Sequence, residues 1–116
     1  MKIAVCAINN KGIYVIAESM GCADVFLFFD INTKKIVEEI LTNKHKNSAN
    51  PEIFCAQLLI SKGANVVVCS DFEEDAKKLF IEADIKLIEN SRQSVKNFLS
   101  RFLAGLLRLY EKQVFK

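Results

Sequence analysis

The chain lacks the residue patterns on which several common classes of protein depend. Its 116 residues include a single histidine, His45, placed between two lysines in a polar segment, so a Ser-His-Asp type of catalytic triad is not expected. Gly21 is isolated, and neither of the glycine-rich fingerprints that bind nucleotide phosphates is present. Only three of the sixteen basic residues are arginines, and phosphate and base-edge recognition depends mainly on arginine. Nucleic acid is therefore not an expected partner.

Long apolar runs and closely spaced cysteine pairs are also missing. No run of about 18 apolar residues occurs, and the apolar segment after Met1 has only the length of a strand and no cleavage pattern. We therefore expect a cytoplasmic protein that does not associate with membranes. The four cysteines form no Cys-x-x-Cys pair, and in a reducing cytoplasm they are expected to remain thiols.

Two apolar segments predict the centre of a sheet within one α/β domain over residues 1–116. Residues 2–8 and 65–69 are nearly continuous apolar runs, which is typical of strands covered on both faces. A predicted helix separates them, so we expect them to lie side by side and parallel through a right-handed crossover. Further strands are predicted at 25–30, at 35–41 as an edge strand in a hairpin with the former, and at 85–88.

Three helices are predicted from their start and stop signals. Asn50 and Pro51 open the first, and Gly63 ends it. The segment 71–74 has the spacing of a capping box for the second helix, and Ser91 or Ser94 caps the third. The third helix has more apolar width than one sheet face requires, which predicts either a thick core helix or a self-association face. Its apolar residues are Val95, Phe98, Leu99, Phe102, Leu103, Leu106, Leu107, Leu109 and Tyr110.

The chemistry-bearing residues are predicted to meet at the carboxyl edge of the sheet, where ligands of such sheets bind. Residues 12–24 are predicted to form a long excursion over this edge, and 42–50 a polar connector without an apolar anchor. Four cysteines are expected to converge there: Cys6 and Cys69 from strand ends, Cys22 from the excursion and Cys55 from the first helix. Thiolates suit iron–sulfur clusters, zinc and copper(I). The alternative is that the cysteines are small hydrophobic packing residues.

Several short sequence strings, spread over nearly the whole chain, occur in an order that is also found in a known protein family. They are Met1 to Val5, then Glu18, Gly21 and Ala23, Phe26 to Asp30, Ala56 to Leu59, Gly63 to Val68, Ala83 to Lys86, Ser94-Val95 and Phe102 to Gly105. In these strings the chain resembles the dinitrogenase iron-molybdenum cofactor biosynthesis family, of the nitrogenase-accessory NifX and NifB C-terminal-domain type. The resemblance implies a three-layer ribonuclease-H-like fold. Its mixed five-stranded sheet has the order 3-2-1-4-5, with strand 2 antiparallel and helices on both faces.

The candidate site residues follow the family's loop, with one notable change. A Glu-His-Phe-Gly-Arg-Ala type of string in the family stands here as residues 18–23, with Ser19 in place of the histidine often credited with holding the metal cluster. Candidate ligand-binding residues are Glu18, Gly21 and Asn9. Candidate metal ligands are Cys22, Cys6, Cys69 and Cys55, for an iron–sulfur-type cluster or a thiophilic metal ion.

Two functional hypotheses follow. The first is a non-enzymatic accessory or carrier domain that binds a metal, metal cluster or small anion at the carboxyl edge and has a metal-cofactor assembly protein as its partner. The alternative is a protein–protein interaction module of the same fold that has lost its ligand and binds a partner, or a second copy as a homodimer, through the C-terminal helix. An enzyme is not expected, because the central strands offer only Asp30, whereas two-metal nucleases need several carboxylates.

Overall fold

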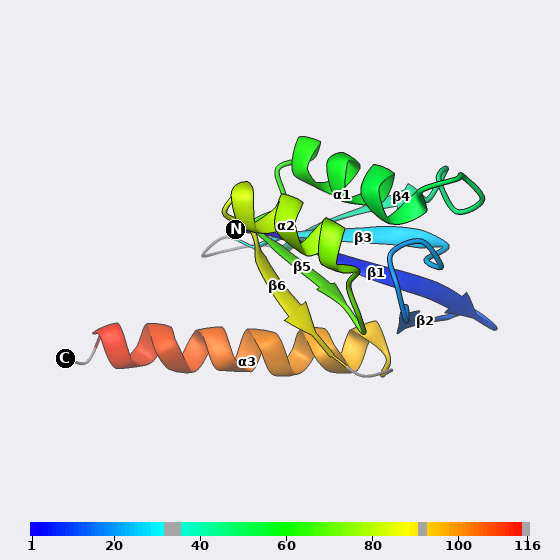
Figure 1. Cartoon of the computed structure of the whole chain (residues 1–116). Helices are drawn as coiled ribbons and strands as arrows, with labels where there is room; N and C mark the ends of the chain where they lie inside the picture. Colours follow the sequence, from blue (N-terminus) through cyan, green and yellow to red (C-terminus); the bar gives the residue numbers. More distant parts are fainter. Residues whose placement is uncertain (32–35, 91–92, 115–116) are drawn as a thin grey trace.

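The computed structural model describes residues 1–31, 36–90 and 93–114 of the chain. These residues form six strands and three helices, arranged as shown in Figure 1. The strands are β1 (Lys2–Asn10), β2 (Ile13–Ile16), β3 (Val25–Ile31), β4 (Ile36–Thr42), β5 (Val66–Cys69) and β6 (Lys86–Glu89). The helices are α1 (Pro51–Ser61), α2 (Glu74–Glu82) and α3 (Val95–Val114). None of these described helices is long and apolar enough to cross a membrane.

The described strands form one mixed sheet with the order β4-β3-β1-β5-β6, and β2 pairs with the end of β1 outside that path. β1 runs antiparallel to β3 and parallel to β5. The predicted parallel neighbours, residues 2–8 and 65–69, are thus confirmed. The prediction of five strands in the order 3-2-1-4-5 is wrong. The described residues form six strands, because residues 13–16 form the additional strand β2, and the order differs from the predicted one.

The additional strand arises from a tight turn that the sequence analysis treated as the start of a long excursion. Lys11 and Gly12 have φ angles of 52° and 88°, and two consecutive positive φ values are typical of a type I′ hairpin turn. Oδ1 of Asn9 accepts a hydrogen bond from Gly12 N at 2.9 Å and stabilises the turn. β2 then pairs antiparallel with β1. The predicted excursion over residues 12–24 is therefore shortened to a loop of residues 17–24.

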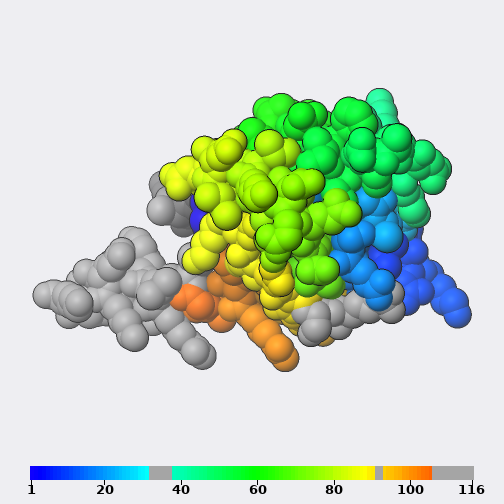
Figure 2. Space-filling model, in the orientation of Figure 1, coloured from blue at the N-terminus to red at the C-terminus, as the bar shows by residue number. Residues whose placement is uncertain are grey.

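Both faces of the sheet are covered, because successive side chains of the central strands point into two different cores. α1 and α2 cover the core that contains Cys6 and Phe26. α3 covers the opposite core, in which Val5 and Phe98 are buried. Figure 1 shows α3 on the far side of the sheet from the other two helices, and Figure 2 shows α1 and α2 packed against each other. This double coverage explains the continuous apolar sequences of β1 and β5.

The predicted start of α1 at Pro51 and the Ser94 cap of α3 agree with the structure, whereas the predicted start of α2 does not. Asn50 occupies the N-cap position of α1 as predicted but makes no side-chain cap hydrogen bond. Pro51 is the first residue of α1, and Oγ of Ser94 accepts a hydrogen bond from Asn97 N at 3.1 Å at the start of α3. Ser91 lies outside the described residues. The capping box predicted at 71–74 is wrong, since α2 begins at Glu74 without a side-chain cap hydrogen bond. The backbone N of Asp71 instead donates to the loop of residues 17–24, which keeps this segment out of the helix.

Candidate functional site

The loop of residues 17–24, called here the edge loop, closes the carboxyl edge of the sheet. Ala17 lies between the middle of β1 and the end of β5: its N donates to Cys6 O at 2.8 Å, and its O accepts from Ser70 N at 2.9 Å. Glu18 O accepts a further hydrogen bond, from Asp71 N at 2.9 Å. These three bonds fix the beginning of the edge loop to both central parallel strands, in the region where ligands of open α/β sheets bind.

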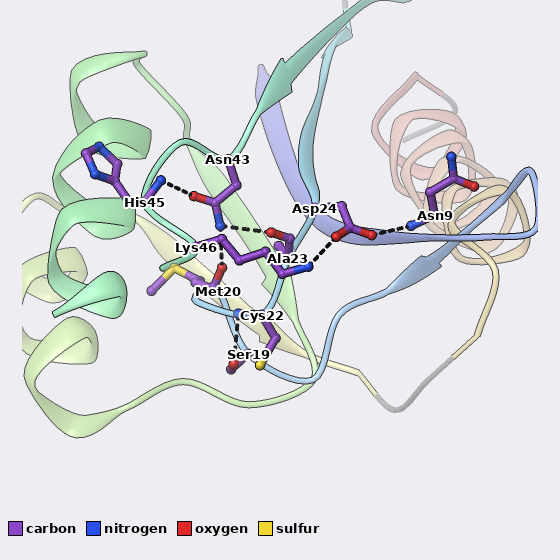
Figure 3. A network of polar contacts seen from close by, with 9 residues as sticks. All are labelled: Asn9, Ser19, Met20, Cys22, Ala23, Asp24, Asn43, His45 and Lys46. Carbon is purple, nitrogen blue, oxygen red and sulfur yellow. Dashed lines mark hydrogen bonds and ion pairs between the residues drawn. The ribbon is translucent and has the colours of Figure 1, made fainter. Parts of the chain in front are cut away.

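A buried asparagine on the connector after β4 holds the far part of the edge loop. Nδ2 of Asn43 donates to Met20 O at 3.1 Å and to Ala23 O at 2.9 Å. Its Oδ1 accepts a hydrogen bond from His45 N at 3.0 Å, as Figure 3 shows. Asn43 is 6% exposed. The connector at 42–50, predicted to lack an apolar anchor, is therefore anchored by an amide that satisfies three backbone groups.

The first turn of α1 contacts the middle of the edge loop. Gly21 N donates to Oε1 of Glu52 at 2.8 Å, and Glu52 is 6% exposed. A Cβ atom on Gly21 would lie 2.9 Å from Cγ of Pro51, so only glycine allows this close approach. Oε2 of Glu52 is buried and has no hydrogen-bond partner among the described residues. An unpartnered polar atom in a protein interior is costly, and such atoms often mark functional positions.

Three of the four cysteines lie together beneath the edge loop. Cys6, Cys55 and Cys69 are fully buried in the core under α1 and α2. Sγ of Cys69 lies 3.3 Å from Ala17 O, and Sγ of Cys55 lies 3.5 Å from Oδ1 of Asn43. Val5 of β1 pairs with Val68 of β5, and Cys6 and Cys69 are the next residues on these two parallel strands. The two thiols are therefore neighbours.

The surroundings of these thiols favour the protonated form. Burial, followed by a hydrogen bond with Cys69, raises the pKa of the Cys6 thiol well above its usual value. Burial and the nearby Glu52 carboxylate raise the pKa of Cys55 to about 11. Because the thiolate is the form that attacks electrophiles and binds metals, both groups are poor ligands at neutral pH.

The raised pKa of Cys55 predicts a loss of stability at alkaline pH. Below the usual cysteine pKa of about 8.5 the thiol is protonated in both the folded and the unfolded state. Between that pH and about 11, the unfolded chain loses the proton while the folded chain retains it, so the free energy of unfolding falls as pH rises. Urea unfolding under reducing conditions at about pH 8 and about pH 10.5 measures this fall.

The control for this prediction is the exposed cysteine. We expect Cys55→Ala to reduce the alkaline loss of stability, while the buried Cys6, whose pKa is also raised, continues to contribute part of it. Cys22→Ala, at the exposed thiol, should leave the loss as in the wild type. An equal slope in the two variants would show that titration of Cys55 does not couple to folding.

Cys22 is the one accessible thiol of the four. It is exposed at the tip of the edge loop, and its backbone N donates to Oγ of Ser19 at 3.3 Å. Figure 3 shows Ser19 and Cys22 on the same turn, with Asn43 on the inner side of the loop. Within the part of the chain that the structure describes, no group of three or more His, Cys, Asp or Glu residues is placed to hold a metal ion. The four thiols thus divide into one outer and three inner groups.

The other predicted ligand residues have different surroundings. Asn9 stabilises the β1–β2 turn through its side chain, and its N donates to Oδ2 of Asp24 at 3.0 Å. A hydrogen bond from Lys46, followed by that from Asn9, lowers the pKa of Asp24. Lys46 and Asp24 form an ion pair, and Figure 3 shows Asn9 on the side of this pair that faces away from Cys22. Glu18 is exposed at the start of the edge loop.

Two residues that hold the loop were not singled out by the sequence analysis. Asn43 lies in a run of polar residues, and nothing local distinguishes it from its neighbours. Glu52 follows Pro51 in the first turn of α1, where an acidic residue is expected for the helix dipole alone. Both contacts join segments more than twenty residues apart in sequence, so they depend on the tertiary structure.

These features define a small mixed α/β domain whose carboxyl edge is closed by a structured loop with one outward thiol. The sequence profile of the dinitrogenase iron-molybdenum cofactor family matches residues 1–105, and the chain belongs to this family. Proteins of this family act in the biosynthesis and binding of the iron–molybdenum cofactor, as accessory or carrier proteins of cofactor assembly. No curated protein matches the chain significantly.

Solved structures share the fold. The apo form of the orange protein from Desulfovibrio gigas has a TM-score of 0.75 at 24% identity, over 90% of this chain and 88% of that chain. The crystal structure of PH0822 has a TM-score of 0.75 at 17% identity, over 90% and 92% of the two chains. A NifB-like protein from Thermotoga, solved by NMR, has a TM-score of 0.72 at 18% identity, over 90% and 88%.

Proposed function

We propose that this chain is a non-enzymatic accessory domain that carries a metal ion or metal-containing cluster as cargo at the carboxyl edge of a ribonuclease-H-like sheet. Membership of the iron-molybdenum cofactor family supports this role. Cys22 is the proposed ligand and Glu18 lines the cargo, whereas Gly21, buried and hydrogen-bonded to Glu52, positions the loop from the inside. A metal-cofactor assembly protein is the proposed partner, because cargo must be received and released.

The observation that carries the proposal is the contrast between the support of the edge loop and the exposure of Cys22. Hydrogen bonds from Asn43 to Met20 O and Ala23 O, and from Gly21 N to Glu52, hold both sides of the turn from the inside. The thiol of Cys22 remains accessible outside. A soft ligand on a preorganised turn suits a thiophilic metal, because little conformational entropy is lost on binding.

The buried thiols fit such cargo poorly. Cys6, Cys55 and Cys69 are each 0% exposed, so a bulky cluster cannot reach them while the edge loop is in place. The raised pKa values of Cys6 and Cys55 add the cost of deprotonation. A single protein thiolate leaves the remaining coordination positions to ligands that belong to the cargo or to the partner. Weak anchoring of this kind is appropriate for a carrier that has to release what it binds.

The single histidine supports a role without acid–base catalysis. The ring of His45 stacks on Phe54 with the ring centroids 5.2 Å apart, and its backbone N is bound by Asn43. Both contacts are structural. Asp30, the carboxylate on the central strands, is exposed and lies 3.8 Å from the N-terminal amine.

Anaerobic metal uptake tests the proposal. We expect the reduced chain to retain iron after incubation with Fe²⁺ and sulfide, or copper after incubation with Cu⁺, following desalting. Visible absorption and elemental analysis measure the retained metal. Replacing the exposed ligand in Cys22→Ser removes the thiolate and should reduce uptake by at least about tenfold, since a charged soft ligand contributes more than about 1.4 kcal/mol to binding.

The matched control is Cys55→Ala, which removes a buried thiol without touching the outer face of the edge loop. We expect it to retain metal like the wild type. Equal uptake by the wild type and Cys22→Ser, or no uptake of iron or copper by the wild type, would refute Cys22 as the cargo ligand.

A further inference from the structure

Two buried cysteines, Cys6 of β1 and Cys69 of β5, lie next to each other on the central parallel strands. They directly follow the pair formed by Val5 and Val68, and both side chains lie in the core under α1 and α2. The Cys6 thiol makes a hydrogen bond with Cys69. Neighbouring strands lie about 4.8 Å apart, which falls within the range of Cα separations that a disulfide spans. The two thiols are therefore placed to form a covalent bond with each other.

Packing by itself does not require cysteine on this face of the sheet. Two residues earlier on the same face, Ala4 pairs with Val67, and both are 0% exposed. Alanine and valine thus fill the core between the sheet and the helices at that level. The thiol pair stands at the next level, where the edge loop covers the sheet.

Cys55, the third buried thiol, is held by other groups. Its Sγ lies 3.5 Å from Oδ1 of Asn43 and 3.8 Å from Met20 O. Cys55 acts on Cys6 through its charge, whereas Cys69 acts through a hydrogen bond as well. Cys6 and Cys69 are therefore the pair that the structure brings together.

The Cys69 thiol also holds the start of the edge loop. Its Sγ donates a hydrogen bond to Ala17 O at 3.3 Å, and the same carbonyl accepts a hydrogen bond from Ser70 N at 2.9 Å. A sulfur atom in a disulfide carries no hydrogen and cannot donate. Formation of a disulfide by Cys69 therefore removes a donor from Ala17 O.

We propose that Cys6 and Cys69 form a reversible disulfide when the chain meets hydrogen peroxide, and that this bond loosens the edge loop. One thiolate attacks a peroxide oxygen and becomes a sulfenic acid, and the leaving hydroxide takes up a proton to form water. The second thiol displaces the hydroxyl group from that sulfur, which forms the S–S bond and releases a second water. Two protons and two electrons leave the pair, and one peroxide is reduced to two waters. A thiol reductant reverses the reaction by thiol–disulfide exchange.

The edge loop controls access to the pair. Both thiols are 0% exposed, so peroxide reaches them only when the loop opens. Burial also raises the pKa of Cys6, which makes its thiolate rare at neutral pH. We therefore expect the exposed Cys22 to be oxidised before the pair. Because Cys22 lies on the same loop, oxidation of the pair should also weaken cargo retention, and this last step rests on the proposed function.

Peptide mapping of the peroxide-treated Cys22→Ser chain tests the disulfide. This variant lacks the exposed thiol, and cleavage by trypsin after lysine places Cys6, Cys55 and Cys69 on separate peptides. The remaining thiols are alkylated in denaturant without reductant before digestion. We expect one pair of peptides linked through Cys6 and Cys69, an alkylated Cys55, and loss of the link after treatment with dithiothreitol.

Amide hydrogen exchange of the same samples measures the loosening of the edge loop. Exchange at the amides of Ala17, Ser70 and Asp71, which join the loop to the strands, should become at least about threefold faster on oxidation, as the loss of one hydrogen bond implies. Cys69→Ala should show the same faster exchange without peroxide, because alanine has no donor either. The matched control is Cys55→Ala in the Cys22→Ser chain, which should form the disulfide as the parent does.

Two results would overturn the proposal. Absence of the link between Cys6 and Cys69 after peroxide treatment, or a link to Cys55 in its place, would exclude the disulfide. A linked chain with unchanged exchange at the three amides would exclude its effect on the edge loop. Metal uptake is measured on the reduced chain, so the proposed cargo site and the disulfide can fail separately.

Discussion

Asn43→Ala should lower the free energy of unfolding by about 3 kcal/mol, because it removes one side chain that satisfies several buried backbone groups. The carbonyls of Met20 and Ala23 each lose a donor, and His45 N loses its acceptor. The site is 6% exposed, so water has little access to replace these bonds. Urea unfolding followed by circular dichroism measures the loss, with the slope of the transition checked against the wild type.

The effect should concentrate in the edge loop before it spreads to the sheet. Amide hydrogen exchange is expected to become faster at residues 19–23 in Asn43→Ala while the amides of β1 and β5 keep their protection. The matched control is Asn47→Ala on the same connector, because Asn47 is exposed and its loss should change stability by less than about 0.5 kcal/mol. Similar stabilities for the two variants would mean that Asn43 does not hold the loop.

Gly21→Ala should also be destabilising, by about 2 kcal/mol, for a steric reason. The added Cβ would lie 2.9 Å from Cγ of Pro51 and 3.1 Å from Oε1 of Glu52. The proline ring is fixed at the first position of α1 and cannot rotate away, so the edge loop has to move outward. That movement stretches the 2.8 Å hydrogen bond between Gly21 N and Glu52 and leaves the buried carboxylate less satisfied.

Gly105→Ala is the control for this prediction, because a Cβ there meets nothing within 4 Å. It lies inside α3, where alanine is favoured over glycine, so we expect a gain of up to about 1 kcal/mol in dilute protein. In addition, Gly21→Ala should reduce iron uptake, since Cys22 is the next residue on the displaced turn. A Gly21→Ala variant as stable as the wild type would show that the contact between the loop and α1 relaxes without cost.

Much of the fold followed from local sequence. The apolar runs of β1 and β5 predicted two neighbouring parallel strands, and the structure pairs Val5 with Val68 in that way. Pro51 and Ser94 marked the starts of α1 and α3 correctly, because proline at the first helical position and serine at a cap act within a few residues. The β2 strand was missed, since it depends on positive φ at Lys11, a residue whose type does not favour that conformation.

The candidate site was predicted less completely than the fold. The edge-loop residues Glu18, Gly21 and Cys22 were predicted from the sequence, and they lie on one structured turn at the carboxyl edge. Cys6, Cys55 and Cys69 were predicted to join Cys22 at one rim, and this is wrong, because the three thiols lie in the core beneath the loop. The prediction that both Cys6 and Cys69 end strands is wrong for Cys6, which lies in the middle of β1 because this strand continues to Asn10. Whether a strand cysteine faces a ligand or a helix depends on what covers it, and that cover comes from segments distant in sequence.

The amino-acid sequence by itself determined the alternation of strands and helices, the double-sided burial of the central strands and the loop that lies at the carboxyl edge of the sheet. These properties arise from the spacing of apolar residues and from turn and cap residues that act locally. Only the tertiary structure decided which thiol is accessible and which side chains hold the edge loop. Those outcomes depend on long-range contacts, such as Asn43 with Met20 and Gly21 with Glu52, whose partners meet only after the whole sheet has formed.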